Sequence, residues 1–168
     1  MRLCGMLLIM TAALGMGFGS GMELARQEKT LKEILQMLLL LKGEIRYGNV
    51  TLKEACLDVS ERMRGTCRLF LKDLSDGIPG PDFGGLFAAC VDRHLKTAGL
   101  SAFQLEPLYL LGNRLGYLDV SVQIRQLELC EESLGQMLAR MQKELPQKQK
   151  LYRSLGILGG LMLVLLLW

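Results

Sequence analysis

The sequence has few of the residues that catalytic and metal sites need. It contains one histidine, His94, and five cysteines that form neither a CxxC pair nor a regular spacing. Zinc sites use cysteines and histidines at short, defined spacings, so the common zinc motifs are excluded. No GxxxxGK[ST] loop is present to cradle a phosphate. We therefore expect no enzyme activity, no cofactor and no metal.

Signals for β-structure are also missing. Aromatic residues make up 6% of the chain, and no segment alternates apolar and polar residues as a half-buried strand does. Excess positive charge is small as well, at +3, and basic residues are interleaved with acidic ones, as in "ARQEKTLKE". Such runs are typical of solvated helix faces, so we expect an all-α protein that does not bind nucleic acid.

Charge is almost absent from both ends of the chain. Residues 1–22 carry only Arg2, and residues 154–168 carry no charged side chain. A bilayer core needs roughly 20 helical residues, with about 17 as the lower limit. The sequence therefore predicts transmembrane helices at 1–22 and 151–168, with a charged domain at 23–150 between them. A cleaved signal peptide is the alternative for the first segment, but its apolar run is long for that purpose.

Basic residues near the two predicted spans indicate the orientation. Lysine and arginine accumulate on the side of a membrane that faces the cytoplasm. On the other side of the predicted spans stand only Arg2 and the amino terminus. We therefore expect residues 23–150 to lie in the cytoplasm, anchored at both ends in the lipid bilayer. The cysteines, odd in number, then stay reduced and act as small core residues. The basic residues on the central side are Arg26, Lys29, Lys32, Lys143, Lys148, Lys150 and Arg153.

The central region has the apolar spacing of amphipathic helices. Positions 31, 34, 38, 41 and 45 form one helix face, and nothing breaks the pattern between 22 and 24. Asn49 or Thr51 caps a second helix, and Glu54 stands at the capping-box distance from Thr51. Further helices are expected at about 66–75, 83–98, 101–115 and 119–145. "SDGIPGPDFGG" is the clearest loop. We expect an antiparallel six-helix bundle.

Three blocks of sequence point to a known family. They are "EIRYGNVTLKEA" (residues 44–55), "LGNRLGYLDVSVQIRQLEL" (111–129) and "KLYRSLGILGGLMLVLLL" (150–167). In this order, in a chain of this length, they resemble the stage III sporulation protein AB family of endospore-forming bacteria. The chain departs from that pattern at Leu118, where a small polar residue is expected, and at Phe87, where a tryptophan is usual.

The resemblance implies a function that composition alone does not. The family belongs to the secretion-like channel complex of the outer forespore membrane, which links mother cell and forespore. Its cytoplasmic bundle is similar to domains of the inner-membrane platform protein of type II secretion systems. The implied partners are the ATPase of the complex and its other membrane proteins, and a homo-oligomer is possible. The implied role is that of a non-enzymatic platform. The alternative is a membrane-anchored receptor or sensor whose bundle binds a small ligand.

Matching positions give the candidate site residues. We expect Gly48 and Gly116 to end helices and Asp119 to cap the sixth helix. Glu44 and Gln123 are polar residues on apolar helices, suited either to bonding between helices or to a partner. Gly156 and Gly160 stand four apart on one face, the small-xxx-small spacing of packed membrane helices. The other matched positions are Tyr47, Leu115, Ser154, Leu155 and Gly159.

Overall fold

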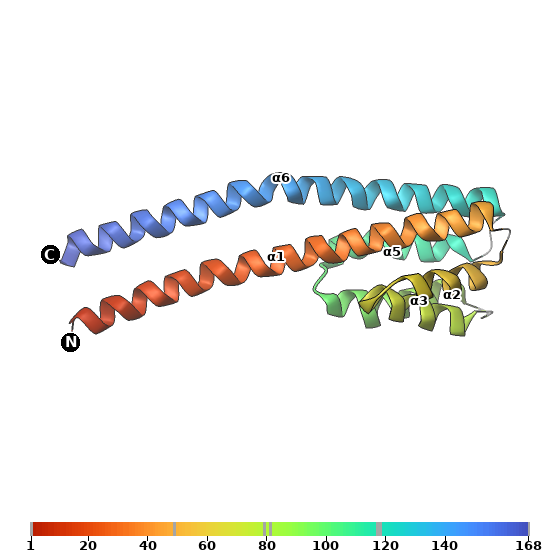
Figure 1. Ribbon diagram of the computed structural model, residues 1–168, viewed down its shortest axis with the longest axis horizontal. Helices are drawn as coiled ribbons and strands as arrows, with labels where there is room; N and C mark the ends of the chain where they lie inside the picture. The colour runs from red at the N-terminus through yellow and green to blue at the C-terminus, as the bar shows by residue number, and fades with distance from the viewer. Residues whose placement is uncertain (1, 49, 79, 81, 117–118, 168) are drawn as a thin grey trace. The chain divides into compact units, whose positions relative to one another are not determined.

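The computed structural model describes residues 2–48, 50–78, 80, 82–116 and 119–167, with side chains from 23 to 143 outside those gaps. This part of the chain contains six α-helices and no strand (Figure 1), which confirms the all-α class. The helices are α1 (Arg2–Tyr47), α2 (Leu52–Arg62), α3 (Gly65–Gly77), α4 (Phe83–Cys90), α5 (Ala102–Leu115) and α6 (Val120–Leu167). A π-helical turn, Val91–Leu95, and a 3₁₀ turn, Lys96–Ala98, follow α4.

The chain divides into two compact units. One contains residues 29–138, which we call the core unit. The other combines residues 1–28 with 139–168. In this second unit the side-chain amide of Gln142 donates a hydrogen bond of 2.9 Å to Glu28. Helices α1 and α6 each contribute residues to both units.

The predicted membrane spans, 1–22 and 151–168, fall on residues whose side chains lie outside the described part. Among the residues that the structure describes with side chains, no helix combines the length and the apolar character needed to cross a bilayer. The backbone of α1 is helical without interruption from Arg2 to Tyr47. This confirms the expected continuity of the first helix past residue 22.

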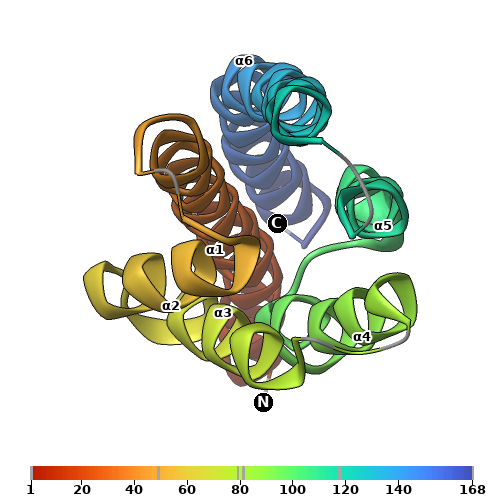
Figure 2. The same cartoon turned by 90° about the vertical axis from the view of Figure 1, so that its right-hand side faces the viewer.

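The helices of the core unit do not share one axis. Figure 2 shows α1, α5 and α6 close to end-on, whereas α2, α3 and α4 lie across the view. Ion pairs of Lys42 with Glu131 and of Arg46 with Glu128 show that α1 and α6 run in opposite directions. An antiparallel order of all six helices is not confirmed. With 11 and 13 residues and a two-residue link, α2 and α3 pack on each other as a short pair.

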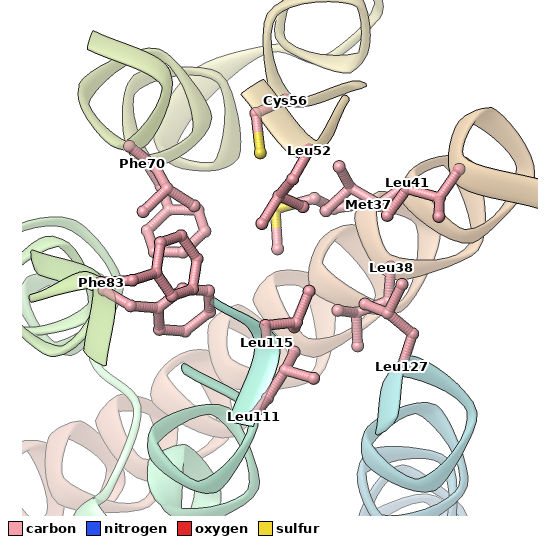
Figure 3. Close-up of a pocket in the computed structure, with 13 residues that line it drawn as sticks. Met37, Leu38, Leu41, Leu52, Cys56, Phe70, Phe83, Leu111, Leu115 and Leu127 are labelled. Carbon is pink, nitrogen blue, oxygen red and sulfur yellow. The ribbon is translucent and has the colours of Figure 1, made fainter. Parts of the chain in front are cut away.

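The core draws apolar side chains from every helix of the core unit. The predicted face of α1 is confirmed, because Leu31, Ile34, Leu38, Leu41 and Ile45 are all buried. Figure 3 shows Met37, Leu38 and Leu41 of α1 converging with side chains of α2 to α6 around the centre of the core. The cavity there measures about 10 Å³, which is close to the minimum for a single water. The core is therefore filled by side chains.

Side-chain caps begin three of the helices. Thr51 and Glu54 form the predicted capping box of α2, with 2.8 Å between Thr51 N and Glu54 Oε2. Asp82 accepts a hydrogen bond from Gly85 N at the start of α4. Ser101 and Gln104 form a second capping box, on α5. The sequence signal for that box, S-x-x-Q, was present in "SAFQ".

Pro107 lies inside α5 and does not end it. Proline lacks the amide that would bond to the carbonyl four residues earlier, which belongs to Phe103. Phe103 is exposed, so water can serve that carbonyl. The carbonyl of Pro107 itself accepts a weak contact of 3.5 Å from the thiol of Cys130 on α6.

The four described cysteines, Cys56, Cys67, Cys90 and Cys130, are buried free thiols, as expected. Burial raises the pKa of Cys56, Cys67 and Cys130 to about 12 and also raises the pKa of Cys90. A thiol reacts as the thiolate, which at pH 8 is about one part in ten thousand for a pKa of 12.

We therefore expect these four thiols to resist iodoacetamide at pH 8 in the folded chain and to react fully in urea. Peptide mass spectrometry gives the labelling of each cysteine separately. Rapid labelling of Cys130 in the native protein would contradict the burial described above. Because the pKa is raised, increasing the pH towards 12 should restore reactivity even before unfolding is complete.

Candidate functional site

Two of the three family blocks meet at one end of the core unit. The first ends α1 at residues 44–48, and the second spans the junction of α5 and α6 at residues 115–123. Figures 1 and 2 both place these two segments at the same end of the helices. The ion pair between Arg46 and Glu128, 2.8 Å long, joins the two helices beside them. We call residues 44–48 together with the described residues of 115–123 the motif-bearing end.

On α1, the three matched residues have different surroundings. Glu44 Oε1 lies 2.7 Å from Arg62 Nη1 at the end of α2, so this carboxylate ties two helices together. Tyr47, the last residue of α1, is 83% exposed. Gly48 follows the helix, and its amide donates to the carbonyl of Glu44 at 2.8 Å. A Cβ at position 48 would lie 2.6 Å from that same carbonyl oxygen, which explains the glycine.

At the α5–α6 junction, Gly116 is the C-cap of α5, so the predicted helix end is confirmed. Its φ of −71° is not left-handed, however. The glycine is needed because a Cβ would lie 2.6 Å from Cβ of Phe83. Asp119 directly precedes α6, and its carbonyl accepts the amides of Val122 and Gln123. Its carboxylate accepts the hydroxyl of Ser121 at 2.8 Å.

The side chain of Gln123 forms a hydrogen bond between helices, which is one of the two roles that the sequence left open. Its side-chain amide donates to the carbonyl of Leu115, at 3.3 Å, one of the last carbonyls of α5. Such carbonyls have no partner within their own helix. Gln123 therefore holds the α5–α6 junction together, as Glu44 holds α1 to α2.

The third family block lies outside the residues with described side chains. Ser154, Leu155, Gly156, Gly159 and Gly160 all belong to that part of α6. The structure thus brings together the first two blocks and leaves the third as a prediction.

The charged residues that link α1 to α6 were not predicted from the sequence. Lys42 and Arg46 stand four apart on α1, opposite Glu131 and Glu128 on α6. The hydrogen bond that Arg46 donates to Glu128, followed by its hydrogen bond with Tyr47, raises the pKa of Arg46. The spacing does place each pair on one face of its helix, because the two basic residues are four apart and the two acidic residues are three apart. Nothing in the sequence indicated that these helices are neighbours.

A second polar cluster surrounds the single histidine. His94 lies in the π-helical turn and is mostly buried, with Nε2 2.7 Å from Oδ2 of Asp73 on α3. Arg93 reaches the same carboxylate at 3.1 Å. The bond from His94, followed by that from Arg93, lowers the pKa of Asp73 although partial burial opposes this. No group of three metal-ligating side chains occurs among the described residues. The cluster links α3 to the turn after α4.

Comparison with known proteins agrees with the sequence blocks. No solved structure matches the chain significantly. The stage III sporulation protein AB of Bacillus subtilis (strain 168) is 26% identical over 172 residues, which covers 99% of both chains. The family model of stage III sporulation protein AB matches residues 2–168. The chain therefore belongs to the stage III sporulation protein AB family.

Proposed function

We propose that this protein is a non-enzymatic platform subunit of a sporulation channel complex between mother cell and forespore. The apolar segments at 1–22 and 151–168 would anchor it in the outer forespore membrane, with the helical bundle in the cytoplasm. The bundle would correspond to the domains of the type II secretion platform protein. Its partners would be the ATPase of the complex and the other membrane proteins. Family membership and the two apolar, almost uncharged ends support this proposal.

One observation favours a platform over a receptor for a small ligand. Ligand pockets commonly enclose about 300–1,000 Å³ and combine apolar walls with a few polar groups. The cavity at the centre of the core unit measures about 10 Å³ and is lined by apolar side chains and one cysteine. A small metabolite does not fit this space. A bundle with a filled core is suited to present its surface.

The motif-bearing end is the surface that we propose for docking the ATPase. Glu44, Gln123 and Gly116 serve the internal structure there, so they hold the end in shape. Tyr47 is not packed into the core unit in this way, because 83% of its surface is exposed. Tyrosine combines a large apolar ring with a hydroxyl and is enriched at the centres of protein interfaces.

Site-specific photo-cross-linking in sporulating cells tests this docking. A photoreactive phenylalanine analogue replaces Tyr47 in one strain and Phe103 in a matched strain. Phe103 is also an exposed aromatic residue of the core unit, at 65%, but it lies at the opposite end of α5. We expect a cross-link to the ATPase from position 47 and little from position 103. Equal yields from both positions, or a cross-link from position 103 alone, would contradict the docking surface.

The membrane topology has its own test. In the proposed topology, Glu132 on α6 faces the cytoplasm. A cysteine placed at Glu132 should therefore react with a membrane-impermeant thiol reagent only after the membrane has been opened. Labelling of intact cells before engulfment would place the bundle on the outer side and contradict the proposed orientation.

A further inference from the structure

A groove runs along the surface of the core unit between α1 and α6. Its volume is about 650 Å³. From α1, Leu35 and Leu39 line it, and Leu39 is 53% exposed. Leu35 and Leu39 therefore add apolar contact area to a groove that is otherwise lined mainly by charged residues. We call this surface the acidic groove.

The charge of the groove comes from α6. Glu128, Glu131 and Glu132 line it against a single lysine, Lys42. Glu128 and Glu131 already have basic partners, Arg46 and Lys42. The carboxylate of Glu132 accepts only the side-chain amide of Gln136, at 3.5 Å, among the described residues. The groove can therefore accept a basic side chain without losing an existing ion pair.

Gly135 of α6 also lines the groove. It lies in the interior of α6, where glycine weakens a helix relative to alanine. A Cβ at this position would meet no atom within 4 Å, so packing does not require the glycine. At Gly112 and Gly116, close neighbours leave no room for a Cβ atom. At Gly135 the space is open, so a docked side chain can occupy it.

The same chain carries a surface of opposite charge on α3. Arg64, at the N-cap, is followed by Arg68 and Lys72 at intervals of four residues, so the three lie on one face. Leu69 lies beside them and is 54% exposed. No ion pair is recorded for these three basic residues within the described chain. Like charges one turn apart repel each other, and a partner of opposite charge removes this penalty. We call these four residues the basic stripe.

We propose that the basic stripe of one copy docks in the acidic groove of a second copy. Leu69 would contact Leu39, and Arg68 and Lys72 would approach Glu132. A helix about 10 Å across occupies about 420 Å³ per turn, so the groove accepts between one and two turns, which is enough for the segment from Arg68 to Lys72.

The two surfaces lie on different helices, and both face away from the core. In Figures 1 and 2, α3 lies on the opposite side of the core unit from α6, with α1 between them. A contact between two different surfaces is heterologous, so it adds copies head to tail and forms a ring or an open chain. This association does not use the motif-bearing end and is independent of the docking proposed for the ATPase.

A charge exchange tests the proposal with two differently tagged full-length chains that are co-purified in detergent. Glu132→Lys/Gln136→Lys reverses the charge at Glu132 in the groove and adds a second positive charge one turn along α6, and Arg68→Glu/Lys72→Glu makes the stripe acidic. We expect wild-type copies to co-purify, and each double variant to lose self-association by about tenfold or more. Mixing the two variants should restore it, since each surface again meets its opposite. Recovery also shows that both variants are folded.

Monomeric wild-type chains, or variants that associate as wild type does, would overturn the proposal. So would a mixture that fails to recover, because the groove would then serve a different occupant. Gly135→Leu provides a second variant, which fills the groove with a good helix former and leaves all charges unchanged. It should remove association while the native protection of Cys130 against iodoacetamide persists. Retained association in this variant would also overturn the proposal.

Discussion

Replacing Phe70 by alanine should lower the free energy of unfolding by about 3–5 kcal/mol, the usual cost of deleting a buried aromatic side chain. Phe70 is fully buried on α3. Its ring meets that of Phe87 edge-on, with 5.3 Å between ring centroids and 84° between the ring planes. The substitution therefore removes apolar burial, an aromatic pair and contacts around the centre of the core.

The neighbouring residue provides the control. Leu69 is one position away on the same helix but is 54% exposed, so Leu69→Ala should change stability by less than about 0.5 kcal/mol. The labelling of Cys130 as a function of urea reports unfolding of the core unit in the full-length chain. Equal effects of the two substitutions would show that α3 does not bury the face described here.

Introducing a single methyl group at Gly112 should destabilise the protein, although alanine is the better helix former. A Cβ at this position would lie 2.5, 2.6 and 2.8 Å from three atoms of Phe87, one of which is its own Cβ. The Cβ of Phe87 is fixed to its backbone, so rotation of the side chain does not relieve this contact. Overpacking of this kind costs about 1–3 kcal/mol, which exceeds the gain of up to about 1 kcal/mol in helix propensity.

Gly135→Ala is the matched control, with the opposite sign expected. It is the same substitution inside a helix, but the new methyl group meets nothing within 4 Å. Stability should rise by up to about 1 kcal/mol. Phe87→Leu should reduce the cost of Gly112→Ala in the double variant, because the two residues share one contact. A stabilising effect of Gly112→Ala alone would contradict the packing of α5 against α4.

Local signals in the sequence were sufficient for the helices and their ends. The periodic apolar face of α1 is confirmed at Leu31, Ile34 and Leu38. Thr51 and Glu54 form the predicted cap, and the glycine-rich loop separates α3 from α4. These features depend on interactions within about four residues, so spacing and residue type determine them.

The roles of the site glycines were less accessible. Gly116 was expected to end its helix, and it does, but its conformation is ordinary. The requirement for glycine comes from Phe83, which is distant in sequence. The same holds for Gly112 and Phe87. A close approach between two helices leaves no local pattern, whereas a left-handed turn does.

The sequence by itself determined the all-α class, most helix boundaries, the reduced buried cysteines and the family. Only the tertiary structure decided that α2, α3 and α4 cross the direction of α1, α5 and α6 (Figure 2), and that two family blocks meet at one end. It also decided which charges are paired and which, as at Glu132 and along the basic stripe, face outward. Helices form from contacts between near neighbours in the chain, whereas their mutual packing depends on side chains that the sequence keeps far apart.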